Sequence, residues 1–306
     1  MRTQRSFAET AMSEAEGLWL RGETDQAWSK ADFARHHFHH DDDPCGEAWA
    51  LLMLGDLELA DVRLQGAWMN FSSARELLHD HGQPHHQAHA LLGLARVAEA
   101  RQAYDDAEVL CHQALELFTR QRDRAGEAAT LCHLARLERL MGHDDLACET
   151  LHVALGLYGR MRDGVGQAHT LRHLAALHNA SGQLQDARTV LEQALGLYES
   201  CGDIQHQAHT LAALGSVLRA TETREAAMVA LRRASALYAR CHDMVSQTDV
   251  LVELALLERN LLPASPADDL VQVARLLPYG GEGLEPRLLS IEAARAASLL
   301  RPRTVH

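Results

Sequence analysis

Histidine and aspartate, both of which bind Zn²⁺ or Ni²⁺ in proteins, are concentrated in two short segments of this sequence. One segment contains His36, His37, His39, His40, Asp41, Asp42 and Asp43, and the other contains His79, Asp80, His81, His85, His86 and His89. Turns accept both residue types because water solvates them, and neighbours such as His39 and His40 cannot easily face one tetrahedral ion. We therefore assign no metal ligands and predict no cofactor, and keep a metal-binding protein as the third of three functional hypotheses.

The residues that could act as nucleophiles lack the partners that nucleophilic catalysis needs. The sequence contains no GxSxG motif and no glycine-rich phosphate loop behind a strand. Cys111–His112 and Cys132–His133 are sequence neighbours, and neighbouring side chains point in different directions on a helix. We therefore expect no enzymatic activity.

The charge balance is acidic, with 29 Lys and Arg residues against 42 Asp and Glu residues and a net charge of −13. This excess of negative charge disfavours non-specific binding to nucleic acid or anionic lipid. No apolar run approaches the roughly 20 residues of a membrane-spanning helix, and the first residues lack the apolar core of a secretory signal. The six cysteines lack CxxC spacing, which is typical of reduced thiols. We expect a cytoplasmic protein that binds neither nucleic acid nor membranes.

The elements that must position these residues follow from a repeat of 40 residues. One column of the repeat contains Glu47, Gln87, Glu127, Gln167, Gln207 and Gln247, and leucines follow it at Leu51, Leu91, Leu131, Leu171, Leu211 and Leu251. Small residues form three further columns: Gly55, Ala95, Ala135, Ala175, Gly215 and Ala255; Ala27, Ala67, Ala107, Ala147, Ala187 and Ala227; and Ala34, Ala74, Ala114, Ala154, Ala194 and Ala234. Such a period is the signature of a repeat architecture.

Each repeat is predicted to contain two amphipathic helices. In one repeat, Leu131, Leu134, Leu137 and Leu140 have helical spacing, and Gly142 separates them from a second apolar face that begins at Ala147. Aspartates precede the first helices and should cap them, at Asp43, Asp123, Asp163, Asp203 and Asp243. The small columns suit close crossings of antiparallel helices, where only Gly or Ala leaves room.

Small residues spaced twelve and then seven apart, as in Ala135, Ala147 and Ala154, resemble the tetratricopeptide repeat in its 40-residue variant. Repeats of this length resemble those of kinesin light chains, spindle adaptors and bacterial regulator sensor domains. The resemblance covers roughly residues 6 to 261 and implies an all-α, right-handed superhelical solenoid of antiparallel helix pairs. About seven repeats and a C-terminal capping helix are expected: an array over residues 1–262, a degenerate repeat and cap over 263–300, and a flexible tail over 301–306.

The resemblance also implies which residues line the concave wall, because first helices build that wall in this family. The mapped residues are His89, Arg96, His133, Arg136, Arg139, His169, Arg172, His173, Asn179, His209 and Arg219. Acids at equivalent positions, Asp56, Glu99 and Asp249, lie mainly towards the two ends. The middle repeats are therefore expected to form one continuous groove rich in Arg and His.

These observations favour a scaffold or sensor that binds an acidic peptide or protein segment in the groove. Arginine suits this role because its planar guanidinium can grip a carboxylate with two hydrogen bonds. Binding should tighten below about pH 6.5, where a free histidine begins to gain charge. The alternative is a structural protein that assembles with copies of itself into a homo-oligomer.

Overall fold

The computed structural model describes residues 2–81, 84–221 and 224–259, and these residues form thirteen α-helices without a strand. The helices are α1 (Arg2–Leu20), α2 (Thr24–His40), α3 (Pro44–Ala60), α4 (Leu64–His81), α5 (Pro84–Ala100), α6 (Tyr104–Gln121), α7 (Arg124–Leu140), α8 (Asp144–Met161), α9 (Gly164–Ala180), α10 (Leu184–Cys201), α11 (Ile204–Ala220), α12 (Arg224–Cys241) and α13 (Met244–Arg259). The predicted all-α architecture of helix pairs is confirmed. The first helix begins at Arg2, a few residues before the family resemblance becomes recognisable near residue 6.

Aspartate side chains start several of the odd-numbered helices, as the sequence predicts. The Asp43 carboxylate accepts a hydrogen bond from the Gly46 backbone N–H at 3.0 Å, and Asp123 accepts from Ala125 and Gly126 at 3.1 and 3.0 Å. Asp203 and Asp243 make the equivalent bonds at 3.1 and 3.0 Å. Each bond satisfies a backbone donor that the first turn of a helix leaves unpaired.

The small columns are where neighbouring helices come closest. Both alanine columns of the second helices are completely buried, from Ala27 to Ala227 and from Ala34 to Ala234. At Gly55 and Gly93 the reason is visible, because an added Cβ would lie 2.7 and 2.4 Å from the ring of Phe71. The ring of Phe71 on α4 thus fills the space that Gly55 on α3 and Gly93 on α5 leave open.

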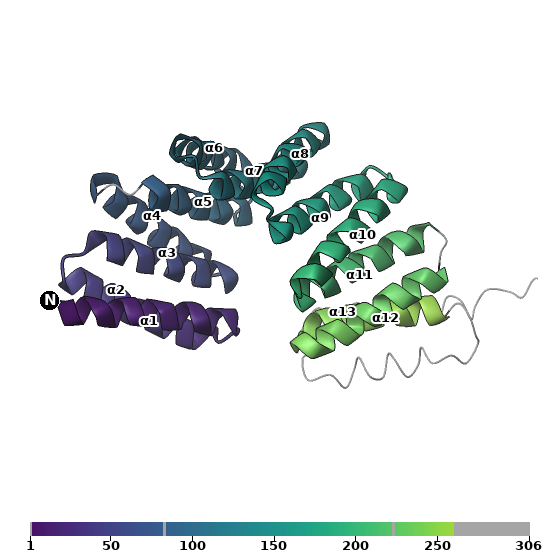
Figure 1. Ribbon diagram of the computed structural model, residues 1–306, viewed down its shortest axis with the longest axis horizontal. Helices are drawn as coiled ribbons and strands as arrows, with labels where there is room; N and C mark the ends of the chain where they lie inside the picture. Colours follow the sequence, from purple (N-terminus) through teal and green to yellow (C-terminus); the bar gives the residue numbers. More distant parts are fainter. Residues whose placement is uncertain (1, 82–83, 222–223, 260–306) are drawn as a thin grey trace, which may run out of the picture. The chain divides into compact units, whose positions relative to one another are not determined.

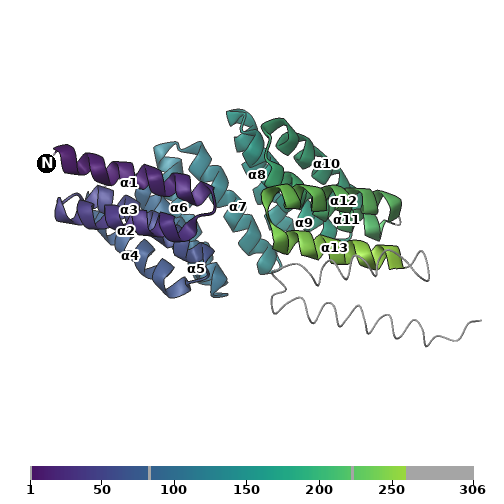
Figure 2. The ribbon, with the colours of Figure 1, turned by 90° about the horizontal axis from the view of Figure 1, so that it is seen from below.

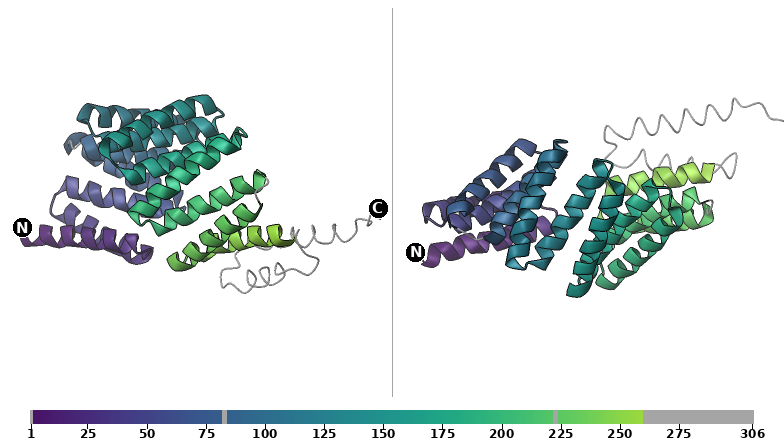
Figure 3. Two further views of the ribbon diagram at one scale, coloured as in Figure 1. Left: turned by 45° about the vertical axis from the view of Figure 1, so that its right-hand side comes forward. Right: turned by 90° about the horizontal axis from the view of Figure 1, so that it is seen from above.

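The helices form two compact units, Met1–Asp163 with α1–α8 and Gly164–His306 with α9–α13. Within each unit, consecutive helices pack as antiparallel hairpins (Figure 1), and further views show the same stacking (Figures 2 and 3). Apolar cores lie between the hairpins, as in the cluster that joins Phe71, Leu78 and Leu94. The expected cap and tail over residues 263–306 lie outside the described residues.

Candidate functional site

All the predicted wall residues lie on odd-numbered helices, which are the first helices of their pairs. His89 and Arg96 are on α5, His133, Arg136 and Arg139 on α7, His169, Arg172, His173 and Asn179 on α9, and His209 and Arg219 on α11. We call the surface that these helices share within each unit the odd-helix face. The predicted residues therefore fall into two groups, one in each unit, and a groove running through both stays a prediction.

In the N-terminal unit, carboxylates of this same chain neutralise two of the predicted arginines. Arg96 Nη1 lies 2.5 Å from Asp56 Oδ1, and Arg136 Nη2 lies 2.5 Å from Glu99 Oε2. Burial raises the pKa of both carboxyl groups, and the arginines oppose that rise. Both pairs join neighbouring repeats, with separations of 40 and 37 residues. Asp56 and Glu99 thus balance the arginines of this wall.

Three histidines of α5 form a second cluster in the same unit. His85 Nδ1 lies 2.9 Å from Asp123 Oδ2, and His85 Nε2 lies 3.1 Å from His89 Nε2. The His89 ring also meets the edge of Phe118, with centroids 5.2 Å apart. Burial lowers the pKa of His89 to about 4, and the charge of His85 acts in the same direction. The expectation that this wall histidine gains charge just below pH 6.5 is therefore wrong.

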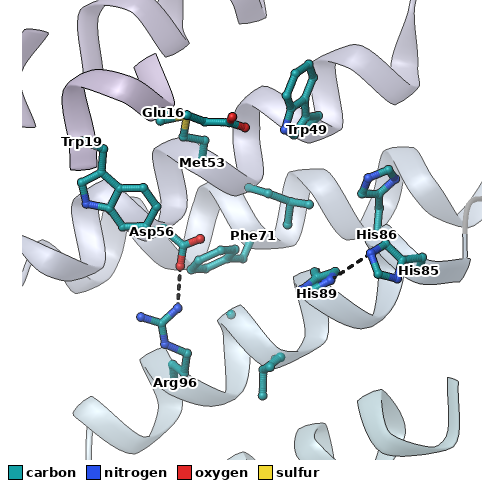
Figure 4. Close-up of a pocket in the computed structure, with 13 residues that line it drawn as sticks. Glu16, Trp19, Trp49, Met53, Asp56, Phe71, His85, His86, His89 and Arg96 are labelled. Carbon is teal, nitrogen blue, oxygen red and sulfur yellow. Dashed lines mark hydrogen bonds and ion pairs between the residues drawn. The ribbon is translucent and has the colours of Figure 1, made fainter. Parts of the chain in front are cut away.

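A cavity of about 310 Å³ opens beside this cluster (Figure 4). Its lining residues come from α1, α3, α4 and α5: Glu16, Trp19, Trp49, Leu52, Met53, Asp56, Phe71, His85, His86, His89, Leu92, Gly93 and Arg96. Of these, the sequence had assigned only His89 and Arg96 to a binding surface. Trp49 occupies the same column as His89, and Glu16 and Trp19 occupy the columns of Arg96 and Arg139, so the repeat could have pointed to all three. The mapping of the wall did not extend to the first helix, where Ala11 replaces the leucine of its column.

In the C-terminal unit, aromatic and histidine side chains surround Arg172. The Tyr198 hydroxyl lies 3.0 Å from His169 Nδ1. Burial raises the pKa of Tyr198, and the nearby Arg172 guanidinium opposes that rise. The His206 ring stacks on Tyr198 with centroids 5.3 Å apart, and His206 Nδ1 lies 2.7 Å from Asp203 Oδ2. This cluster combines a guanidinium with several hydrogen-bonding groups.

The positive charge of Arg172 affects the pKa values of two neighbouring side chains, His209 and Tyr238. Burial lowers the pKa of His209, and the charge of Arg172 lowers it further. Burial raises the pKa of Tyr238 to about 12, while Arg172 opposes that rise. The centroids of the His209 and Tyr238 rings lie 5.2 Å apart.

Arg172 differs from Arg96, Arg136 and Arg219, which each pair with a carboxylate. Among the described residues, no carboxylate lies within ion-pair distance of its guanidinium. Arg219, in contrast, lies 3.4 Å from Glu253, which also accepts a hydrogen bond from Ser216 at 3.1 Å. Asn179 is exposed. The sequence did not single out Tyr198 or Tyr238, although tyrosine replaces the Phe118 of the same column in three successive repeats.

The histidine-rich segments and the cysteine pairs bear on the other hypotheses. His39 Nδ1 lies 3.0 Å from Glu47, and His40 Nδ1 lies 3.4 Å from Asp41. The part of the chain that the structure describes contains no group of three or more His, Cys, Asp or Glu side chains that could hold a metal ion. Burial raises the pKa of the Cys111 thiol to about 12, which opposes formation of a nucleophilic thiolate at neutral pH.

None of the helices within residues 2–81, 84–221 and 224–259 has the length and apolar character to cross a membrane.

Comparisons with known proteins relate the chain to solenoids of helix pairs. No protein-family model matches the sequence, and no curated protein matches it. Among solved structures, BtubC from P. vanneervenii is 17% identical with a TM-score of 0.58, covering 79% of this chain and 92% of its own. A Rap protein complexed with Competence and Sporulation Factor is 15% identical with a TM-score of 0.62, covering 96% and 95%.

A third similar structure belongs to a larger protein. It is a STAND-class signal transduction ATPase with a tetratricopeptide repeat sensor from Pyrococcus horikoshii, 14% identical with a TM-score of 0.68. The match covers 96% of this chain and 44% of that one. Together with the 40-residue columns and the helix pairs, these similarities show that the chain has the fold of tetratricopeptide-repeat proteins, an all-α solenoid.

Proposed function

We propose that this protein is an interaction scaffold that binds a segment of a partner protein on its odd-helix face, where Arg172 receives an acidic side chain. Stacked helix pairs expose an extended surface built from many first helices, and repeat proteins use such surfaces for binding. The Rap structure that resembles this chain was solved with Competence and Sporulation Factor bound, which supports a binding role for the fold.

The observation that carries the acidic preference is the absence of an ion-pair partner for Arg172 among the described residues. A half-buried guanidinium gains most from a carboxylate because charge-assisted hydrogen bonds are about twice as strong as neutral ones. Tyr198 lies beside it and is itself fixed by a hydrogen bond to His169 at 3.0 Å, so the surroundings of the guanidinium are preorganised, which reduces the entropy lost on binding. The N-terminal unit contributes less to this preference because two of its three wall arginines, Arg96 and Arg136, already pair with Asp56 and Glu99.

A random peptide library selected against the purified protein tests this proposal. The wild type should enrich peptides that contain Asp or Glu, and the Arg172→Gln variant should lose that enrichment. For an enriched peptide, we expect affinity to fall about tenfold or more, the effect of removing a hydrogen bond to a charged group. Binding should also weaken with added salt, which screens exposed charges beyond about 8–10 Å.

Arg188→Gln provides the matched control, because Arg188 lies on α10 and pairs with Glu192 of the same helix at 2.8 Å. This variant removes one positive charge from the same unit without touching the odd-helix face. It should therefore enrich the same peptides as the wild type. If Arg172→Gln also enriches acidic peptides with unchanged affinity, the proposed role of Arg172 is wrong.

A further inference from the structure

The cavity of the N-terminal unit has a charge opposite to that of the Arg172 cluster. Its charged lining residues are Glu16, Asp56 and Arg96. Asp56 and Arg96 form an ion pair at 2.5 Å and largely offset each other. Glu16 has no ion-pair partner among the described residues, whereas Glu14 on the same helix pairs with Lys30 at 2.6 Å. One carboxylate is therefore left uncompensated at the cavity.

The histidines of the cavity do not compensate this carboxylate at neutral pH. Burial lowers the pKa of His86, and the pKa of His89 is lowered to about 4. His85 faces Asp123 at 2.9 Å, so any positive charge that it gains is balanced outside the cavity lining. His86 Nδ1 is buried without a hydrogen-bond partner among the described residues. The cavity thus presents a carboxylate without an ion-pair partner beside His86 and His89, two histidines whose pKa values are lowered.

Aromatic and apolar side chains supply the rest of the lining. Trp19, which is 38% exposed, and Trp49 flank Glu16 in Figure 4, and Phe71 lies deeper beside Asp56. Leu52, Met53 and Leu92 add apolar surface. Indole rings attract cations placed over their faces, and apolar surface accommodates the methylene stem that carries the cation of Arg or Lys. A cavity of about 310 Å³ suits a small group of this kind.

We propose that this cavity binds a cationic side chain with an apolar stem, that of arginine or lysine, between Trp19, Trp49 and Glu16. The inference rests on the proposed function, since it takes the cation to be part of a bound protein segment. It adds a second specificity to that function: the N-terminal unit selects a basic residue, whereas Arg172 selects an acidic one.

Titration with N-acetyl-arginine amide and N-acetyl-lysine amide tests the inference without a protein partner. The chain has four tryptophans, and NMR resolves their indole N–H signals once each is assigned by a Trp→Phe variant. Either cationic probe should shift the signals of Trp19 and Trp49 saturably and leave those of Trp28 and Trp68 in place. N-acetyl-norleucine amide, which has a similar stem without charge, should bind more weakly.

The Glu16→Gln variant should weaken binding of the cationic probes by about three- to fivefold, the effect expected from an exposed ion pair. Glu14→Gln is the matched control and should bind like the wild type. Both residues are exposed, so neither change should alter the melting temperature appreciably. Equal binding of the norleucine and arginine probes, or no shift at Trp19 and Trp49, would overturn the inference.

The experiments distinguish an error in the cavity inference from an error in the proposed function. If the amides leave Trp19 and Trp49 unchanged while the library still yields Arg172-dependent acidic peptides, only the cavity inference is wrong. If the amides bind saturably but the library yields no peptides, the proposed function is wrong and the cavity remains a cation site.

Discussion

At the scale of single residues, the arginines of the odd-helix face have two different roles. Arg96 and Arg136 compensate half-buried carboxylates of neighbouring repeats, so they stabilise the stacking of helices. Removing one of them would leave a partly desolvated carboxylate without its counter-charge, which costs more than the ion pair itself contributes. Arg172 lies beside Tyr198 but has no carboxylate within ion-pair distance among the described residues, so its charge is available to a ligand.

Glu138 on α7 provides a test of how burial affects stability. It is 7% exposed, Thr150 donates a hydrogen bond to its Oε1 at 3.2 Å, and its Oε2 has no partner among the described residues. Burial raises the pKa of this carboxyl above its value in the unfolded chain. The folded state therefore favours the protonated carboxyl. The protein has the full stability that this group allows below the unfolded pKa of about 4.5, and it loses stability as the pH rises through the folded pKa.

We expect Glu138→Gln to stabilise the protein by about 1 kcal/mol at pH 7, because glutamine accepts the Thr150 hydrogen bond without burying a charge. The gain should vanish below about pH 4, where the glutamate is protonated in both states. Denaturant unfolding at both pH values measures the difference. Glu149→Gln, on the exposed surface of α8, should change neither value. A gain that persists at low pH would show that charge burial is not its cause.

At the scale of elements, the second residue after the end of several first helices adopts a left-handed backbone conformation, which glycine accepts without strain. Gly22, Gly142 and Gly182 end first helices with φ values of +78°, +84° and +73°, and Val62 occupies the equivalent position with φ of +59°. A β-branched residue is strained in this left-handed region. Val62 is also 73% exposed, so packing does not compensate that strain.

Val62→Gly should therefore stabilise the protein by about 0.5–1 kcal/mol, which is the relief of left-handed strain minus the greater entropy of glycine in the unfolded chain. Val109→Gly is the opposite control. Val109 is 56% exposed within α6, where glycine is the poorer helix former and should destabilise. Thermal unfolding of the two variants measures both effects. If Val62→Gly lowers the melting temperature, the turn gains more from the valine side chain than it loses to strain.

At the scale of the whole molecule, the sequence predicts the helix pairs but not their electrostatics. Periodicity of 40 residues and caps such as Asp43 and Asp123 fix which segments are helical, because these signals are local. Pairing between repeats depends on side-chain reach: Arg136 contacts Glu99, which is 37 residues away and outside its own column. The cavity depends on Trp19 and Glu16, which lie on α1, where alanine replaces the Leu51 column of the repeat.

The division into two units leads to a last prediction about folding. The apolar clusters that hold α1–α7 together, with Phe38, Phe71 and Phe118 among their buried members, lie wholly within residues 1–163. In repeat arrays each hairpin is stabilised mainly by its nearest neighbours, so a fragment that keeps these clusters keeps most of its stabilising contacts. We expect residues 1–163 to fold alone, with a helical circular dichroism spectrum, cooperative thermal unfolding and the same Trp19 and Trp49 response to N-acetyl-arginine amide as the full chain. A fragment that folds but loses this response would show that the cavity needs residues beyond 163, and an unfolded fragment would show that its stability depends on the C-terminal unit.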